Sequence, residues 1–200
     1  MFSETIQKRV LQRQLEMPSV AGKLAFLGNL IFCYQYMVAS HNLALVAARN
    51  SEGALHEYFK KHAEEEKNHA EWLRADLSTE GADVNEMPLS LYAQCMVGTQ
   101  YYNIFHDHPA SLLGYMALLE MNPMSLAQIE KLEAMYGKPL LRTLRFHAEH
   151  DLDHAKDLKD ILDTLPDTLH SIVVDSLNRT ADYMHAALNL LTFKEPQHAH

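Results

Sequence analysis

The sequence contains few glycines, prolines and cysteines, and it has no excess of basic residues. Seven glycines and seven prolines in 200 residues are few, and the prolines fall between apolar-periodic segments, where they start or separate helices. Cys33 and Cys95 stand alone in apolar sequence, which is not the pattern of a disulfide framework or a CxxC metal motif. With 17 Lys and Arg against 26 Asp and Glu, the chain has no large basic surface for nucleic acid or anionic lipid.

A long hydrophobic run is also missing. No uninterrupted apolar stretch reaches the roughly 18 residues of a membrane-spanning helix, and the first residues, MFSETIQKRVLQRQLEM, lack the apolar core of a secretory signal. We therefore expect a cytoplasmic protein without a membrane partner. A hydrophobic content of 48% and a charged content of 22% are typical of one folded globular domain.

The apolar periodicity predicts an all-α domain that spans residues 1–200, with a core over about 19–193. We expect a bundle of about seven helices, a short N-terminal helix and a frayed tail from Glu195 to His200. Ser51 is the expected N-cap of one long helix. The predicted helices span residues 4–16, 19–50, 51–77, 88–105, 109–122, a shorter segment that ends near 136, 138–165 and 167–193.

The segment 138–165 carries the most informative motif. His147, Asp151 and His154 share one helix face in HxxxDxxH spacing, and leucines at helical spacing lie on the same face above and below them. Ionisable groups in the middle of a buried stripe are costly unless they are paired, hydrogen-bonded or bound to a metal. His150 lies at the edge of this stripe and could join the group or support it.

A second stripe runs along the segment 51–77. His62, Glu66 and His69 interrupt an apolar face there, and Glu66 and His69 form an ExxH pair, the arrangement by which one helix supplies a carboxylate and an imidazole to a metal. Glu64 and Glu65 lie off the centre of the stripe, where we expect them to be solvated or to support a ligand.

A third candidate, Glu120, follows the apolar segment GYMALL near the end of a helix. The negative end of the helix dipole and the apolar surroundings disfavour an ionised carboxylate there, so a nearby cation would explain it. The candidates combine three carboxylates with three imidazoles, which is a dinuclear set. Nitrogen and oxygen ligands without thiolate favour iron or manganese over structural zinc. The six candidates are Glu66, His69, Glu120, His147, Asp151 and His154.

Simpler structural interpretations of these motifs compete with the metal site. Each motif alone is also typical of a solvated charged face or a hydrogen-bonded core histidine, and it is their joint occurrence that favours a metal site. Tyr34, His41 and Met116 are candidate residues of a substrate pocket, although aromatic and methionine stripes are usually core. His41 is either a core histidine, a pocket residue or a haem ligand.

With these motifs, the sequence resembles the haem-oxygenase-like diiron oxidases and oxygenases, which share the helical fold of haem oxygenase and the TenA proteins. The resemblance covers residues 19–193 and implies that His147, Asp151 and His154 bind two iron ions together with Glu120 and His69. In some relatives the remaining ligand lies three residues before the histidine, which matches Glu66. In others it lies seven residues before, where this chain has His62.

The resemblance also implies a function. The iron pair would activate O2, the co-substrate, to oxidise a small acid, amino acid or derivative in a biosynthetic pathway, by C–C cleavage, desaturation or N-oxygenation. An external reductant and a homodimer are further expectations. Three alternatives remain: a metal-free TenA-like hydrolase or transferase that acts on a small heterocycle, a haem-binding protein that uses His41, and a metal-binding domain without enzymatic activity.

Overall fold

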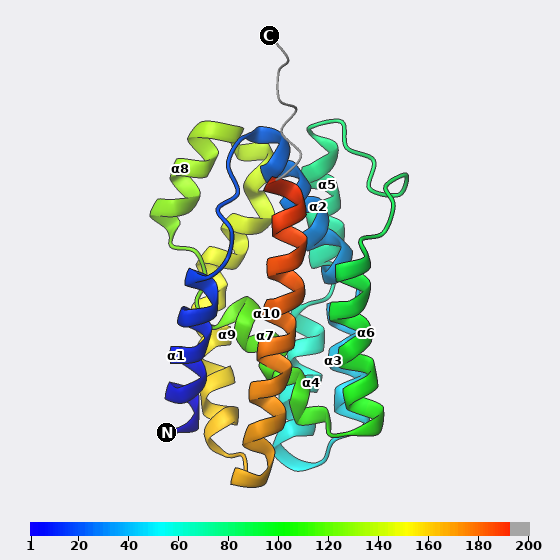
Figure 1. The fold of residues 1–200 in the computed structure, drawn as a ribbon, viewed down its shortest axis with the longest axis vertical. Coiled ribbons are helices and arrows are strands. Elements are labelled where there is room, and N and C mark those ends of the chain that lie inside the picture. The colour runs from blue at the N-terminus through cyan, green and yellow to red at the C-terminus, as the bar shows by residue number, and fades with distance from the viewer. Residues whose placement is uncertain (193–200) are drawn as a thin grey trace.

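The computed structural model describes residues 1–192, and every regular element in that range is helical (Figure 1). The expectation of an all-α fold is therefore confirmed. Short 3-10 helices at Pro109–Ser111, Lys138–Leu141 and Asp167–Leu169 precede three of the α-helices. The α-helices are α1 (Phe2–Leu15), α2 (Lys23–Met37), α3 (Ser40–Arg49), α4 (Gly53–Glu65), α5 (His69–Ser78), α6 (Leu91–His106), α7 (Leu112–Glu120), α8 (Leu126–Tyr136), α9 (Arg142–Asp163) and α10 (His170–Thr192).

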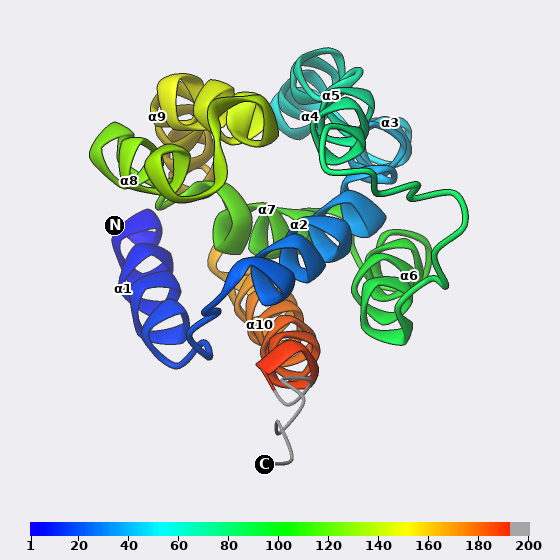
Figure 2. The ribbon, with the colours of Figure 1, turned by 90° about the horizontal axis from the view of Figure 1, so that it is seen from above.

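Helix α7 lies in the middle of the bundle, with the other helices around it (Figure 2). Seven consecutive residues of α7, from Leu112 to Leu118, are buried. Gly114 lets α7 approach α10 closely, because a Cβ atom at this position would lie 2.1 Å from the carbonyl oxygen of Val173. The central position of α7 brings Glu120, at its last turn, into the interior.

Two helices predicted as continuous are each broken. The segment 19–50 divides at Val38 and Ala39, and no proline or glycine marks this break in the sequence. The segment 51–77 divides between Glu66 and Asn68, and Asn68 has φ 74°. Asparagine tolerates the left-handed conformation better than most residues, which makes it a suitable site for such a turn. These two breaks raise the eight predicted helical segments to ten in the described chain.

Helix starts differ from the prediction in places. Ser51 is not an N-cap: its hydroxyl donates to the carbonyl of Ala47 at 2.6 Å, and α4 begins after Glu52. The start predicted near residue 88 lies at Leu91, capped by Ser90, whose hydroxyl accepts from the Tyr92 amide. The first helix of the predicted core begins at Lys23, after Gly22 with φ 85°. The predicted frayed tail, 195–200, lies outside the described residues.

One stretch, Lys23–Arg49, has the length and the hydropathy, 1.3 on average, of a membrane-spanning helix. It corresponds to α2 and α3, and only a third of its most apolar window is buried. The core helix of a soluble protein passes the same test, so this finding is weak evidence for a membrane span.

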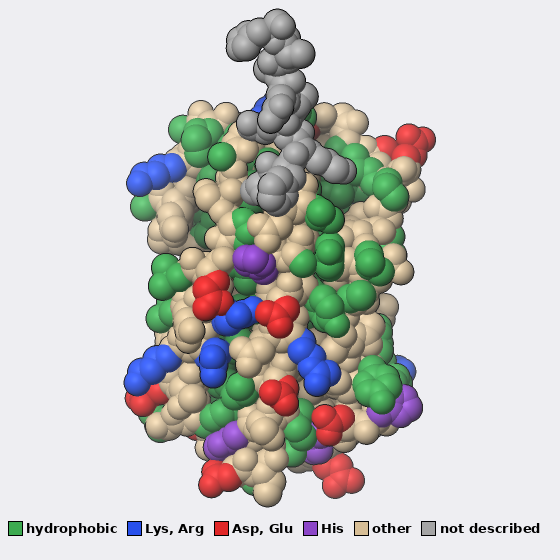
Figure 3. Space-filling view, viewed as in Figure 1, with side chains coloured by type: hydrophobic (Ala, Val, Ile, Leu, Met, Phe, Trp, Pro, Cys, Tyr) green, Lys and Arg blue, Asp and Glu red, His purple; other side chains and the backbone are tan. Residues whose placement is uncertain are grey.

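Asp76 joins two helices that carry candidate ligands. Its carboxylate is buried and accepts hydrogen bonds from the amide and the hydroxyl of Thr143, both at 2.7 Å, and from Nε of Arg142 at 2.9 Å. The bonds link the last turn of α5 to the first turn of α9 and fix the register between these helices. On the outside of the bundle, acidic and basic side chains intermingle on the face formed by α1 and α10, and hydrophobic side chains gather near α6 (Figure 3).

Candidate metal centre

The structure brings all the candidate ligands together in the interior. They come from α4, the turn after it, α5, the end of α7 and the middle of α9. Both alternatives for the remaining ligand, Glu66 and His62, belong to the group. We call it the ligand cluster, and its seven members are His62, Glu66, His69, Glu120, His147, Asp151 and His154.

One half of the ligand cluster lies where α5 meets α9. Nδ1 of His69 lies 3.1 Å from a carboxylate oxygen of Glu66, and the rings of His69 and His147 are in edge contact with centroids 4.8 Å apart. Nδ1 of His147 lies 3.0 Å from Oδ1 of Asp151. The break after α4 contributes directly here, because Glu66 caps α4 while His69 opens α5.

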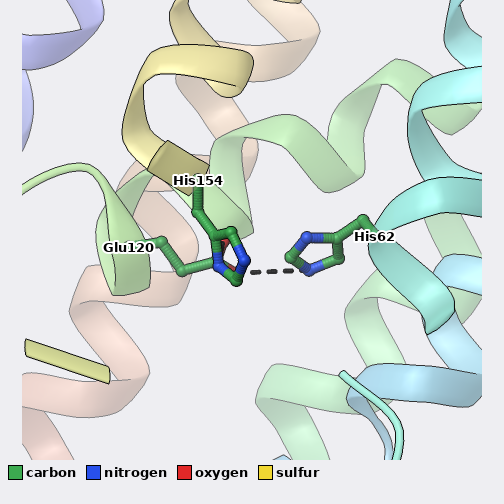
Figure 4. A group of neighbouring side chains, drawn as sticks. All are labelled: His62, Glu120 and His154. Atoms are coloured by element: carbon green, nitrogen blue, oxygen red, sulfur yellow. Dashed lines mark ion pairs between the residues drawn. The ribbon is translucent and has the colours of Figure 1, made fainter. Parts of the chain in front are cut away.

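The other half lies between α4, α7 and α9. His62 points across the interior toward Glu120 and His154 (Figure 4), with Nε2 of His62 3.5 Å from a carboxylate oxygen of Glu120. One ligand atom from each of these three residues lies within 4.8 Å of the others. Oδ1 of Asp151 is 3.7 Å from Nδ1 of His154, so Asp151 lies between the two halves.

Burial shifts the protonation of the imidazoles. Burial of His62 lowers its pKa to about 4, and the neighbouring His154 and His69 add to this effect. The ring is therefore neutral near pH 7, the form that binds a metal. Burial also acts to lower the pKa of His147, but the hydrogen bond with Asp151 and the negative charges of Asp151 and Glu66 together outweigh it and raise the pKa above its usual value.

The pKa values of two carboxylates in the cluster, Glu120 and Glu66, are shifted in opposite directions. Burial and the nearby negative charges of Glu66 and Asp151 raise the pKa of Glu120 well above its usual value. Burial acts in the same direction on Glu66, but the surrounding His69, His62 and His147 lower its pKa overall. Without a metal these surroundings favour the protonated form of Glu120, and a bound cation would favour its ionised form.

Several polar atoms of the cluster have no hydrogen-bond partner although they are buried. They include Oε2 of Glu120, Nδ1 of His154, Nε2 of His147 and Nδ1 of His69, which lies close to Glu66 without forming a hydrogen bond. Buried polar atoms are normally satisfied, so unpartnered lone pairs that share one site call for a ligand. Three residues of the cluster, His62, Glu120 and His154, fit one divalent cation, with nitrogen and oxygen donors suited to iron or manganese.

Glu65 supports the ligand cluster from outside. Its carboxylate lies 3.7 Å from Nε2 of His154, on the opposite side of the ring from Asp151 and Glu120, and it pairs with Lys61 at 3.5 Å. A carboxylate at the second nitrogen of a metal-binding imidazole fixes the orientation of the ring. The sequence left Glu65 either solvated or supporting, and helix periodicity alone places it off the stripe.

Some nearby residues do not join the cluster. His150 is exposed, and its Nδ1 contacts the carbonyl of Phe146 at 2.8 Å. Trp72, the single tryptophan of the chain, contacts the His69 ring with centroids 4.7 Å apart. Trp72 and Phe146 also contact each other and form an aromatic wall beside the site that the sequence analysis did not predict.

A cavity of about 330 Å³ lies on the inner side of the ligand cluster. Cys33, Tyr36 and Ser40, from α2 and α3, contribute to its wall, and sequence periodicity gave no signal that separated Cys33 and Ser40 from the core. None of the three residues predicted for the pocket lines this cavity. Tyr34 packs against the hydrophobic cluster that contains Leu30 and Leu73, Met116 is a core residue, and Nδ1 of His41 contacts the carbonyl of Ala63 at 2.6 Å.

Comparisons with known proteins bear on the fold. No family model matches the chain, and no curated protein is similar in sequence. The structure is similar to the crystal structure of a domain of unknown function with a haem oxygenase-like fold from Shewanella denitrificans OS217, at a TM-score of 0.66 and 16% sequence identity. The match covers 95% of this chain and 88% of the other. The protein therefore has a haem-oxygenase-like fold, as the resemblance implied.

Proposed function

We propose that the protein is a non-haem dinuclear iron enzyme that uses O2 to oxidise a small molecule. The observation that carries the proposal is a buried cluster of four imidazoles and three carboxylates with unpartnered ligand atoms, located against a cavity. A structural histidine cluster would be expected to satisfy its own lone pairs. A metal-binding domain without activity would have no need of the adjacent cavity, which gives a substrate access to the site.

The residues divide into two sets by position. His62, Glu120 and His154 would hold one cation, and Glu66, His69 and His147 the other, with Asp151 between them. Two iron ions would supply the electrons that activate O2, and an external reductant would restore them. The chain itself holds the ligands in place and, by burying His62, keeps that imidazole neutral.

The alternatives fit the structure less well. A haem ligand needs an imidazole that faces a large cavity, and His41 does not line the cavity beside the ligand cluster. A metal-free hydrolase needs an activated nucleophile. The thiol of Cys33 lies in the cavity wall, but burial raises its pKa, which keeps it protonated and weakly nucleophilic.

The proposal is tested by anaerobic loading of the metal-free protein with Fe(II), followed by exposure to O2 with a panel of small acids and amines. We expect iron-dependent O2 consumption that at least one panel member accelerates. His154→Ala should abolish it, and His150→Ala, an exposed histidine one turn away on the same helix, should not. O2 consumption that persists in His154→Ala at the wild-type rate would refute the site assignment.

A further inference from the structure

The wall of the cavity carries charge at one end only. Its charged and titratable side chains include Glu66, Glu120, His147 and Asp151, all of which belong to the ligand cluster. Among the described residues that line the cavity, none is a lysine or an arginine. A ligand inside it therefore has a partner for a charged group at the cluster and nowhere else along the wall.

The uncharged polar side chains of the wall are largely committed to one another. The hydroxyl of Tyr36 donates to the sulfur of Cys33 at 3.3 Å, and the amide of Asn122 donates to the side-chain oxygen of Gln14 at 2.7 Å. Most of the remaining wall is apolar, with leucines, methionines and a phenylalanine from α2, α5, α7, α9 and α10. This part of the cavity is suited to an apolar body rather than to a polar one.

The charge of the occupied cluster sets the charge of the ligand. Two divalent cations bring four positive charges, and ionised Glu66, Glu120 and Asp151 bring three negative ones, which leaves one positive charge. A single anionic group neutralises it. A second anionic group at the far end of the ligand would be buried among apolar side chains without a partner, and an ammonium next to the first group would lie beside the net positive charge of the occupied cluster; both are unfavourable.

We propose that the cavity binds a monoanion with an apolar body, such as an aliphatic monocarboxylate, with its charged end at the ligand cluster. This inference rests on the proposed function, because it requires the cluster to hold two cations. It narrows the broad class of small acids and amino acids: a dicarboxylate places a second charge in the apolar part of the wall, and a free amino acid places an ammonium beside the net positive charge of the occupied cluster.

The test uses protein loaded with Zn²⁺, a redox-inert substitute for iron, and three probes of equal chain length: octanoate, octanedioate and 2-aminooctanoate. Calorimetry should show octanoate binding at least about ten-fold more tightly than the other two, and this binding should disappear when the metal is removed. Equal or tighter binding of octanedioate or 2-aminooctanoate would overturn the inference, and so would octanoate binding that is independent of metal.

The two proposals fail in different ways. Zinc content is measured before the titration, so a protein that takes up no metal refutes both the proposed function and this inference. A protein that takes up metal and, with iron, consumes O2 but does not prefer octanoate refutes only the inference.

A single substitution should shift the ligand preference of the cavity from octanoate toward octanedioate. Met184 lines the cavity from α10, and Met184→Lys places a cation in the apolar wall. We expect octanedioate to gain at least about ten-fold in affinity relative to octanoate. The matched control is Leu190→Lys, an exposed position on the same helix that does not line the cavity, and it should leave the ratio unchanged. An unchanged ratio in a folded Met184→Lys protein would contradict the inference.

Discussion

The interior contains two buried polar groups of opposite character. Between α6 and α10, Gln100, Ser176 and Thr180 satisfy one another: Ser176 donates to the Gln100 carbonyl oxygen at 3.0 Å, and Thr180 donates to the Ser176 backbone at 2.7 Å. The ligand cluster is less completely enclosed; it is ionisable and leaves several ring and carboxylate atoms without partners. A closed neutral network serves packing, whereas an open charged one indicates a ligand. Four predictions test this contrast.

The largest effect is expected at the ligand cluster. His154→Ala removes a donor that faces both Asp151 and Glu120, so affinity for Co²⁺ should fall by at least roughly a hundred-fold while the helical circular dichroism stays unchanged. Because Trp72 touches His69, quenching of its fluorescence reports the titration. A variant that binds Co²⁺ as tightly as the wild type would remove His154 from the site.

For the network of Gln100, Ser176 and Thr180 we expect the opposite result, a loss of stability without a loss of metal affinity. Gln100 is fully buried, and Gln100→Leu leaves the Ser176 hydroxyl without its acceptor, which should cost about 1–3 kcal/mol of unfolding free energy. Urea denaturation measures this loss. The same Co²⁺ titration should give wild-type affinity, and a large loss of metal binding in a folded Gln100→Leu protein would mean that the two polar groups are coupled.

The sequence predicts most of the ligand cluster. It does not predict the break between α4 and α5 or the cavity wall, and both have physical causes. Helix periodicity places His147, Asp151 and His154 on one buried face, because that spacing is a local property of α9. It does not detect the break at Glu66–Asn68, which depends on packing of α4 and α5 against α9. The cavity wall at Cys33 and Ser40 is set by contacts between distant segments, and a buried wall has the same periodicity as a core.

An intermediate effect is expected beside the cluster. Glu65→Gln removes the negative charge that faces Nε2 of His154, and metal affinity should fall by about 10- to 100-fold, the usual range for a carboxylate that orients a metal-binding histidine. Glu64→Gln is the matched control, because Glu64 is the preceding residue on α4 and its side chain is 67% exposed. Equal metal affinities of the two variants would show that Glu65 is solvated and does not orient His154.

The smallest effect is expected at a polar contact near the surface, between the buried Ser3 and the exposed Asp163. The hydroxyl and the amide of Ser3 donate to the Asp163 carboxylate at 2.6 and 2.8 Å, and these bonds lower the pKa of Asp163. A carboxyl whose pKa is lower in the folded state stabilises the fold above its unfolded pKa of about 4, and this stabilisation is lost as pH falls through the folded pKa.

Ser3→Ala should therefore reduce stability at pH 7 by less than about 1 kcal/mol, since solvent screens the contact, and the difference from wild type should shrink in acid. Urea denaturation at pH 7 and pH 3 measures both values. A difference that is the same at the two pH values would show that the contact acts without the charge of Asp163.

The central claim is that the open polar cluster holds two metal ions. The most direct measurement is the amount of Fe(II) that the metal-free protein retains after anaerobic equilibrium dialysis, with the wild type and His154→Ala side by side. The account predicts about two ions per chain in the wild type and fewer in the variant. No retained iron in the wild type, or the same amount in both proteins, would contradict it.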